Sequence, residues 1–257
     1  MRILVKLGGS LLDDAASRRR LARELAAVQD GGVELVVVHG GGKQMTRFLA
    51  DRGVESRFVD GLRVTTPEII DAVLKVFAGS VNHELVSAFV AEGSRAVGLS
   101  GIDAALVEAE ILREDLGAVG RVTRANPGLL RLLASNGYLP VVACVAGDRA
   151  GRVYNVNADQ MAVACACGFE AGKLFFLTDV DGVRGADGAV VPTLTPRAAA
   201  GLIASGVAAG GMQAKLNAAS AAVEGGVAEV MIVPGSMPRV VERLLAGESA
   251  GTRMVAQ

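Results

Sequence analysis

The sequence predicts an α/β fold in which an open, mostly parallel sheet carries helices on both faces. Two features of its 257 residues indicate this fold. Short apolar runs rich in β-branched residues alternate with longer alanine- and leucine-rich segments of helical period. The short runs are apolar throughout, which is typical of parallel strands buried on both faces. The expected strands are Ile3–Val5, Leu35–Val38, Ala96–Leu99, Leu139–Ala143, Leu174–Leu177 and Val230–Val233.

The predicted helices fill the intervals between these strands. Several carry proline in or near the first turn, where its missing N–H leaves no hydrogen bond unmade. Their ranges are Ser17–Asp30, Gly42–Arg52, Pro67–Phe77, Val81–Glu92, Pro127–Asn136, Ala158–Cys167, Pro196–Ser205, Met212–Glu224 and Pro238–Ala246.

Two irregular segments bear on domain organisation. Glycines interrupt Ser100–Thr123, which predicts hairpins that leave the main sheet. A glycine-flanked turn at Phe169–Lys173 predicts a modest boundary between two lobes, residues 1–170 and residues 171–257. The chain has no internal repeat or low-complexity linker, so we expect two lobes of one compact protein.

Composition favours a small-molecule ligand. With 26 basic and 27 acidic residues, the net charge of -1 provides no field that would attract nucleic acid or an anionic membrane. There is no signal-peptide pattern, and no apolar run approaches the roughly 20 residues that span a bilayer. Cys144, Cys165 and Cys167 stand in apolar surroundings without framework spacing, which favours buried thiols in a reducing compartment. We therefore expect a cytoplasmic protein without nucleic acid or membrane partners.

Two of the predicted strands run directly into glycine turns that carry a lysine. Lys6-Leu7-Gly8-Gly9-Ser10 ends the first strand, and His39-Gly40-Gly41-Gly42-Lys43 ends the second, just before a helical pattern. Glycines let backbone N–H groups approach an anion closely, and a following helix turns its positive end toward that anion. One such turn is unspecific, but two predict a ligand with two anionic parts.

Polar residues also follow later strands. Asn155-Val156-Asn157-Ala158-Asp159 has three polar side chains at alternate positions, which an extended backbone would turn to one side. A helix N-cap would account for one of them and leave two for a ligand. Thr178-Asp179-Val180-Asp181-Gly182-Val183 lies at the carboxyl end of a strand, where open α/β sheets bind ligands, although an ordinary Asp-Gly turn has the same pattern. Lys215 has small apolar neighbours in a helix, which predicts a specific partner for its charge.

These glycines and lysines match neither of the common nucleotide signatures. The segment Gly40-Gly41-Gly42-Lys43-Gln44 lacks the preceding glycine and the Ser or Thr of a P-loop, and no Gly-x-Gly-x-x-Gly follows a strand. A Rossmann dehydrogenase is therefore disfavoured.

Six motifs, taken in order, resemble the amino-acid kinase family over nearly the whole chain. The resemblance implies the αβα sandwich of carbamate-kinase-like proteins, with an N-terminal lobe for an acylated amino acid and for dimerisation, and a C-terminal lobe for ATP. It also implies Mg²⁺. The motifs are Lys6-Leu7-Gly8-Gly9, His39-Gly40-Gly41-Gly42, Gly61-Leu62-Arg63-Val64-Thr65, Asn155-Val156-Asn157-Ala158-Asp159, Leu177-Thr178-Asp179-Val180-Asp181-Gly182-Val183 and Gly210-Gly211-Met212-x-x-Lys215.

The resemblance implies a role for each matching residue. Lys6 and Lys215 would be catalytic cations that stabilise the phosphoryl group in transfer, and Asp159 would organise them. No metal ligand from the protein is implied, since the ATP phosphates would mainly hold Mg²⁺. The expected substrate contacts are Gly41, Gly42, Arg63, Asn155 and Asn157. The expected nucleotide contacts are Gly8, Gly9, Asp179, Val180, Asp181, Gly182, Val183, Arg184, Val207, Ala208 and Ala209.

The best-matching branch of the family acts on N-acetyl-L-glutamate. Gly98-Leu99-Ser100-Gly101-Ile102-Asp103, the segment Asp115–Val122 and Asn126-Pro127 carry this similarity. It implies ATP-dependent phosphorylation of the side-chain carboxylate to N-acetyl-L-glutamyl 5-phosphate, the second step of arginine biosynthesis. Ala104-Ala105 and Arg121 depart from the pattern, so N-succinylglutamate and N-acetyl or carrier-bound aminoadipate stay open as substrates. A non-catalytic sensor on the same fold is less favoured, because both lysines and Asp159 are present.

The resemblance also implies a homodimer. The first strand begins at residue 2, which leaves no room for the N-terminal helix that accompanies arginine-inhibited hexamers in the family. We therefore expect a homodimer that arginine does not inhibit.

Overall fold

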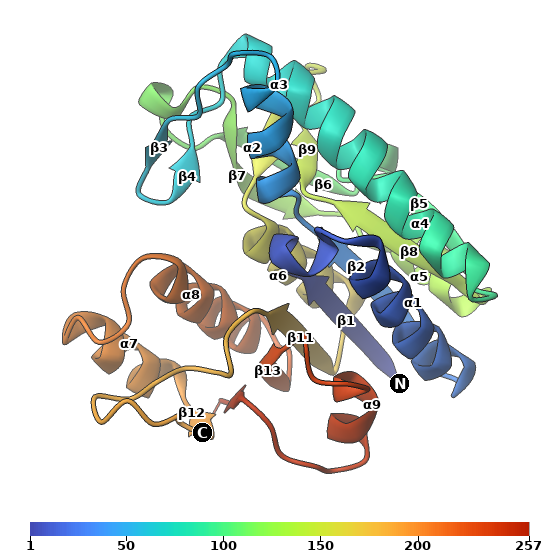
Figure 1. The fold of residues 1–257 in the computed structure, drawn as a ribbon, viewed down its shortest axis with the longest axis vertical. Coiled ribbons are helices and arrows are strands. Elements are labelled where there is room, and N and C mark those ends of the chain that lie inside the picture. The colour runs from blue at the N-terminus through green and yellow to red at the C-terminus, as the bar shows by residue number, and fades with distance from the viewer. Residues whose placement is uncertain (257) are drawn as a thin grey trace.

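The structure, a computed structural model, describes residues 1–256 and is built around an eight-stranded sheet in the order β12-β14-β13-β11-β1-β2-β8-β5 (Figure 1). Every neighbouring pair is parallel except β13 and β14. All six predicted strands are present in this sheet, so the predicted α/β fold is confirmed. The strands are β1 (Arg2–Leu7), β2 (Glu34–His39), β5 (Arg95–Ser100), β8 (Tyr138–Ala143), β11 (Lys173–Thr178), β12 (Thr193–Leu194), β13 (Glu229–Pro234) and β14 (Thr252–Met254).

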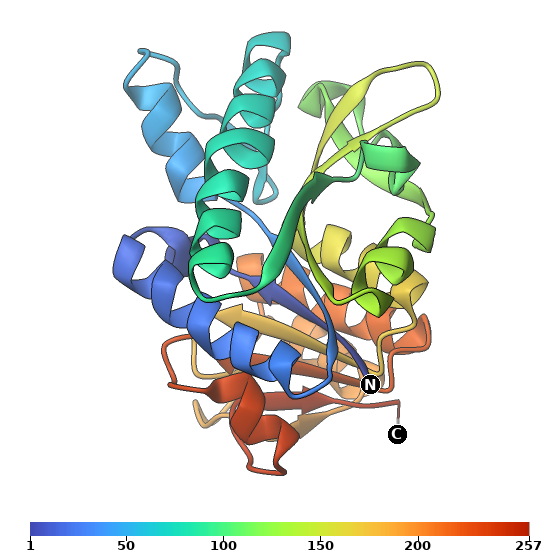
Figure 2. The same ribbon diagram turned by 90° about the vertical axis from the view of Figure 1, so that its right-hand side faces the viewer.

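Helices cover both faces of the sheet, which makes three layers. The α1 and α4 helices lie on one face, and α5, α6 and α8 lie on the other (Figure 2). The predicted helices are confirmed with small shifts at their ends. Their bounds are α1 (Ala15–Asp30), α2 (Gly42–Ala50), α3 (Pro67–Val73), α4 (Asn82–Ala91), α5 (Gly128–Ser135), α6 (Ala158–Phe169), α7 (Pro196–Ala204), α8 (Gly210–Glu224) and α9 (Val240–Leu245).

Side-chain caps explain where several helices begin. Thr66 accepts a hydrogen bond from the N–H of Ile69, and Thr195 accepts one from Ala198. Each of these threonines precedes a proline in the first turn, whose fixed φ suits a helix start. The Asp14 carboxylate caps α1 in the same way. Local sequence therefore sets these helix starts, independently of the packing.

The two helices predicted over Pro67–Phe77 and Val81–Glu92 form one continuous run. Between α3 and α4 the chain makes a π-helical segment, η2 (Leu74–Val81), so the helix continues from Pro67 to Ala91. This run is long and apolar enough to span a membrane, with a mean hydropathy of 1.2 in its most apolar window. The expectation that no segment reaches that length was wrong. In the structure the run packs on β5, β8 and α1, which is the position of a core helix.

The glycine-rich middle of the chain leaves the main sheet, as predicted. There β6 (Val107–Ile111), β7 (Val119–Ala125), β9 (Val145–Gly147) and β10 (Val153–Val156) close on one another in a small four-stranded barrel. A separate hairpin joins β3 (Phe58–Val59) and β4 (Leu62–Arg63). Short 3-10 turns complete the path: η1 (Gly9–Leu12), η3 (Asp103–Ala105) and η4 (Glu114–Leu116).

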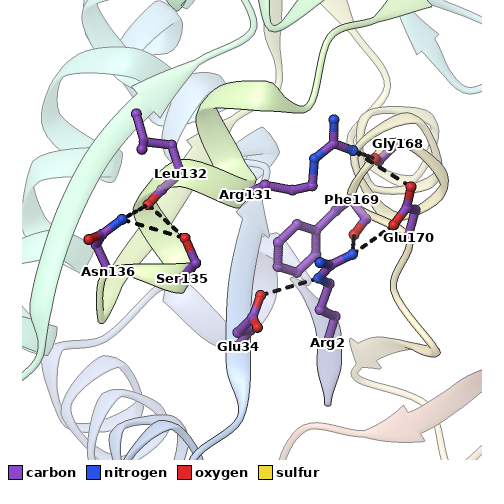
Figure 3. Close-up of polar contacts among 9 residues, drawn as sticks. All are labelled: Arg2, Glu34, Arg131, Leu132, Ser135, Asn136, Gly168, Phe169 and Glu170. Carbon is purple, nitrogen blue, oxygen red and sulfur yellow. Dashed lines mark hydrogen bonds and ion pairs between the residues drawn. The ribbon is translucent and has the colours of Figure 1, made fainter.

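A cluster of polar contacts joins elements at the amino ends of the central strands. Arg2 Nη1 donates to Glu170 Oε2 at 2.7 Å, and Arg2 Nε donates to Glu34 Oε2 at 3.2 Å (Figure 3). Arg131 Nη1 donates to the carbonyl of Gly168 at 3.0 Å, which ties α5 to the end of α6 (Figure 3). These contacts surround the turn where a boundary between lobes was predicted. Because one sheet continues through both parts, the division at residue 170 stays a prediction.

The core is apolar, and its cysteines are free thiols. Cys144 and Cys165 are buried, as predicted, and burial raises the pKa of each to about 12. Cys167 is only half-buried: it packs against the margin of the core, with its sulfur 3.9 Å from the carbonyl oxygen of Ala222 on α8. The expectation of three buried thiols was therefore wrong for Cys167.

Replacing Phe89 by alanine is expected to lower the free energy of unfolding by about 3–5 kcal/mol, because the ring is fully buried on α4 and its loss leaves a cavity. Urea titration measures the change. Leu132→Ala is the control, since that side chain is 61% exposed on α5 and its loss should change stability by no more than about 0.5 kcal/mol. Equal effects of the two changes would contradict the position of the long helix in the core.

Candidate active site

The two predicted anion-binding turns lie side by side. Strands β1 and β2 are adjacent and parallel, with Leu7 paired to His39, so the turns that follow them emerge at the same edge. A β carbon on Gly9 would lie 3.4 Å from the backbone nitrogen of Gly42. Gly42 begins α2, so the positive end of that helix faces the same space. The topology therefore brings both turns into one site.

Lys6, Asp159 and Lys215 meet in a compact ion triad. Lys6 Nζ lies 2.7 Å from Asp159 Oδ1, and Lys215 Nζ donates to Asp159 Oδ2 at 2.9 Å. The three side chains are each 11% exposed and come from β1, α6 and α8. Lys215, whose apolar neighbours predicted a specific partner, has that partner in Asp159. One carboxylate thus holds two ammonium groups close together.

The triad shifts the pKa values of its members. Burial is the largest single influence on Asp159 and raises its pKa, but the attraction and hydrogen bonds of the two lysines outweigh it and leave the pKa lowered. Burial and the nearby Lys6 charge lower the pKa of Lys215, despite the opposing attraction of Asp159. The carboxylate is therefore favoured in its ionised form, and a further anion beside Lys215 would favour the charged form of that lysine.

A large open cavity of about 880 Å³ adjoins the triad. Its wall includes five cationic side chains and three carboxylates, and one of those carboxylates, Asp159, is already paired with two lysines. Such a lining favours a polyanionic ligand. The lining residues are Lys6, Gly8, Gly9, Ser10, Gly42, Lys43, Thr46, Arg47, Phe58, Asp60, Gly61, Leu62, Arg63, Asn157, Asp159, Thr178, Asp179, Val180, Gly210, Gly211, Met212, Ala214 and Lys215.

A smaller cavity of about 170 Å³ lies beside it, and the two cavities share part of their walls. All five predicted substrate contacts line the smaller one. The rest of its wall is largely apolar. It is lined by Gly40, Gly41, Gly42, Phe58, Gly61, Leu62, Arg63, Phe77, Val119, Cys144, Asn155, Val156, Asn157 and Ala158.

Arg63 is fixed in the wall between the cavities. Its Nη2 donates to the carbonyl of Gly42 at 3.1 Å and to Thr46 Oγ1 at 2.8 Å, its Nη1 donates to Ser56 Oγ, and the guanidinium lies 4.6 Å from the ring centre of Phe58. Burial lowers the pKa of Arg63. The group is therefore a preorganised cation that can receive a carboxylate.

The three polar residues around the start of α6 point to different partners. Asn155 Nδ2 donates to Thr65 Oγ1 at 3.0 Å, whereas the Asn157 side chain accepts from the N–H groups of Asp159 and Gln160. The expectation that one of the three serves as a helix cap is confirmed for Asn157. The extended backbone that would turn all three to one side ends at Val156, and the helix begins at Ala158. Even so, Asn155 and Asn157 line the smaller cavity, and Asn157 and Asp159 line the larger one.

The predicted nucleotide contacts divide into two groups. Gly8, Gly9, Asp179 and Val180 line the large cavity. The other seven do not: Val183 is fully buried in the core and gives its N–H to Thr252 Oγ1, and Ala208 is also buried. These seven, which stand outside the lining, are Asp181, Gly182, Val183, Arg184, Val207, Ala208 and Ala209.

Several lining residues were not singled out from the sequence. Thr178 lies in one of the six motifs but was not among the expected ligand contacts, although a polar residue at the carboxyl end of a buried strand itself indicates a ligand site. Phe58 and Phe77 gave no signal, because an apolar side chain that lines a cavity cannot be told from a core residue by pattern. The same holds for Val119 and Cys144 of the smaller cavity.

The carboxylates of this site do not form a metal cage. Within residues 1–256, no three His, Cys, Asp or Glu side chains are grouped closely enough to hold a metal ion. Both Asp159 oxygens face lysines, which leaves Asp179 and Asp60 in the wall of the large cavity. This set fits an ion such as Mg²⁺ that is held mainly by the phosphates of a ligand and by at most one or two carboxylates.

Known proteins resemble this chain over its whole length. The model of the amino acid kinase family matches residues 1–234. Acetylglutamate kinase from Solibacter usitatus is 64% identical over 99% of both chains, and the enzyme of the same name from Bartonella tribocorum is 40% identical over 99% of this chain and 89% of its own. Among solved structures, N-acetylglutamate synthase from Neisseria gonorrhoeae, complexed with coenzyme A and N-acetyl-glutamate, superposes with a TM-score of 0.88 at 25% identity. The match covers all of this chain and 59% of the synthase.

Asp159→Asn is expected to lower the free energy of unfolding by about 3–5 kcal/mol at pH 7, because it leaves two neighbouring buried ammonium groups without their anion. Asp181→Asn is the matched control. The ion pair of Asp181 with Arg184 is exposed and 3.5 Å long, so its loss should cost less than about 1 kcal/mol. Urea unfolding of both variants measures the difference, and similar losses would contradict a stabilising triad.

The difference in unfolding free energy between the wild type and Asp159→Asn is expected to depend on pH. Because the pKa of Asp159 is lowered in the folded state, its charge stabilises the protein above the unfolded pKa of about 3.9, and this stability is lost as pH falls through the folded value. The stability difference between wild type and Asp159→Asn should therefore shrink below about pH 4. A difference that stays constant through this range would show that Asp159 does not act through its charge.

Proposed function

Because this chain belongs to the amino acid kinase family, we propose that it transfers the γ-phosphoryl group of ATP to the side-chain carboxylate of N-acetyl-L-glutamate. The product is N-acetyl-L-glutamyl 5-phosphate, and the reaction is the second step of arginine biosynthesis. The observation that carries the proposal is the Lys6–Asp159–Lys215 triad, which lies at the wall of a cavity suited to a polyphosphate. Full-length relatives that bear the name acetylglutamate kinase support the choice of acceptor.

The residues of the triad suit a carboxylate acceptor. A side-chain carboxylate with a pKa of about 4.3 is already ionised near neutral pH and needs no general base. The reaction instead requires two anions to be brought together and charge on the transferred phosphoryl oxygens to be neutralised. Lys6 and Lys215 supply fixed positive charge for this purpose, and Asp159 holds both ammonium groups in place before the substrates arrive.

We place the acylated amino acid in the smaller cavity. Arg63 would bind the α-carboxylate, and the amides of Asn155 and Asn157 would face the acyl amide. The apolar wall formed by Phe77, Val119 and Cys144 is suited to the methyl group of an acetyl substituent. Gly41 and Gly42 would then lie beside the side-chain carboxylate, at the boundary with the larger cavity.

We place ATP in the larger cavity, with its phosphates at Gly8 and Gly9 and its nucleoside toward Asp179 and Val180. This assigns the acylated substrate to residues 1–170 and the nucleotide mainly to residues 171–257. The other seven predicted nucleotide contacts would require the segments around Asp181 and Val207 to move toward the ligand. Mg²⁺, bound to the phosphates, would neutralise part of their charge. The protein would act in the cytoplasm.

A non-catalytic sensor on the same fold is the second candidate. It would keep the smaller cavity and Arg63, but it would not need two lysines held on one carboxylate at a polyphosphate site. The intact triad therefore favours an enzyme. Kinases for N-succinylglutamate or aminoadipate derivatives are less favoured, because the acyl end of the smaller cavity is lined by apolar side chains.

The activity is tested with MgATP and hydroxylamine, which traps an acyl phosphate as a hydroxamate. N-acetylglutamate, N-succinylglutamate, N-acetylaminoadipate and free glutamate are supplied separately, and hydroxamate is expected with N-acetylglutamate alone. Hydroxamate with another acceptor would correct the substrate, and none with any acceptor would support the sensor.

In the same assay, Lys215→Ala is expected to lose about a hundredfold or more in kcat while remaining folded. Removing one well-placed donor to a developing anion costs roughly 3–4 kcal/mol of transition-state stabilisation. Lys75→Ala is the control, since Lys75 is exposed and pairs with Asp71 on the long helix. Near-normal turnover of Lys215→Ala would refute the role given to Lys215.

We also propose that the protein is a homodimer. Strand β5 is an edge of the main sheet, and the helical run beside it exposes the apolar side chains Leu74 (37%) and Val90 (55%). A second copy is expected to cover these side chains. Sedimentation equilibrium should give about twice the chain mass of 26.2 kDa, and Leu74→Glu combined with Val90→Glu should shift it to the monomer. A monomeric or hexameric wild type would contradict this assembly.

A further inference from the structure

His39 is fully buried at the end of β2, and both of its ring nitrogens have partners. Nδ1 lies 2.8 Å from the carbonyl oxygen of Gly40, and Nε2 lies 2.9 Å from Asn82 Nδ2. The second proton of the Asn82 amide goes to the carbonyl of Val141, also at 2.9 Å. The activity proposed above uses neither His39 nor Asn82 directly, and neither residue lines the larger or the smaller cavity of the site.

The partners determine where the protons lie. Asn82 Nδ2 must donate to Val141, so it is the amide nitrogen that faces His39, and Nε2 must accept. The proton of the neutral ring is then on Nδ1, which donates to Gly40. Burial lowers the pKa of His39 to about 4, in agreement with a ring that stays neutral. The imidazole is thus held in one tautomer and one orientation.

The π-helical segment places Asn82 where it can reach His39. The N–H of Asn82 donates to the carbonyl of Phe77, five residues earlier, which is the bond that defines a π turn. Five residues advance an α-helix by about 1.4 turns, so an α-helix would turn these two side chains in different directions. In the π turn both face the glycine turn. Asn82 contacts His39, and a β carbon on Gly41 would lie 2.8 Å from Phe77 Cδ1.

The opposite side of Asn82 is equally confined. A β carbon on Gly98 of β5 would lie 2.2 Å from Asn82 Oδ1, so only glycine leaves room for this amide. Asn82 is therefore held between β5, β8 and His39 and has little freedom to rotate. Rigid support of this kind sets the position of the turn Gly40–Gly42, whose last residue begins α2 and lines both cavities.

We propose that His39 and Asn82 are positioning residues for the reaction. Through the carbonyl of Gly40, they orient the turn Gly40–Gly42 toward the carboxylate and phosphoryl groups. This inference rests on the proposed function. The Nδ1–H of His39 is the group that acts on the turn, Asn82 fixes the ring that carries it, and the π turn fixes Asn82. If the buried His39 only filled space, kcat would not depend on which ring nitrogen carries the proton.

Two near-isosteric substitutions test the roles of the two His39 ring nitrogens separately. The amide nitrogen of asparagine at position 39 can replace Nδ1, so His39→Asn keeps the donor to Gly40 and loses the acceptor for Asn82. His39→Gln reaches Asn82 with its oxygen but loses the donor to Gly40. We expect His39→Gln to reduce kcat at least tenfold, with the KM for N-acetylglutamate changed less than threefold. His39→Asn, which keeps the donor to Gly40 but loses the contact that fixes it, should reduce kcat clearly less than His39→Gln does. His83→Gln, an exposed histidine on the same helix, is the control and should change neither.

Equal effects of His39→Asn and His39→Gln on kcat, or an effect on KM alone, would overturn the proposal. If His39→Gln does not fold, Asn82→Ala takes its place, since it leaves Nδ1 and Gly40 intact but frees the ring. A lower kcat at unchanged KM is then expected, and wild-type kinetics would overturn the proposal.

A spectroscopic measurement separates failure of this inference from failure of the proposed function. The ¹⁵N shifts of the His39 ring in the wild type should show a protonated Nδ1 and an unprotonated Nε2 that do not titrate between pH 5 and 8. In Asn82→Ala the Nε2 signal should move. A wild-type enzyme that makes no hydroxamate but shows these shifts would refute the function and leave the ring geometry standing, whereas an Nε2–H tautomer in an active enzyme would refute the inference alone.

Discussion

The charge balance at Asp159 is the constraint on which the site depends. Two lysines can be buried within a few ångströms of each other only if an anion lies between them, because each ammonium group lowers the stability of the other. Lys6 comes from the central strand β1, Asp159 from α6 and Lys215 from α8, so the triad draws three elements far apart in sequence to one point. The same arrangement leaves positive charge facing the large cavity, which links the packing of the fold to the binding of a polyanion.

The turn Gly40–Gly42 is the second organising feature, because it forms part of the wall between the two cavities. It is supported from behind by His39, Asn82 and Phe77, and Arg63 donates to the carbonyl of Gly42 from the other side. Glycine is required at Gly41 because the ring of Phe77 approaches too closely for any side chain. Preorganisation of this kind is what a reaction without a general base needs, since its rate depends mainly on alignment and electrostatic stabilisation.

Much of the site could be predicted because its residues lie in short segments with recognisable chemistry. Glycine turns after apolar strands, and polar residues at strand ends, located the two turns, Asp159 and the start of the segment Thr178–Val183. Prediction was poorer where a residue's environment depends on distant packing. Val183 and Ala208 were expected to contact the nucleotide but are buried, and the lining residues Phe77, Val119 and Cys144 resemble core residues in sequence.

The sequence by itself determined the strands, the helix starts and the order of the motifs, because apolar runs, capping threonines and glycine turns act through local conformational preference and burial. Local pattern alone did not place Lys215 on Asp159, a pairing that only the family resemblance implied. Only the tertiary structure decided that the helix from Pro67 to Ala91 contains a π turn and that Asn82 contacts His39. The physical reason is that these contacts join residues more than 40 positions apart or depend on a one-residue shift in helical register. Neither leaves a periodic signal in the chain, and both become defined only when the sheet order places their elements together.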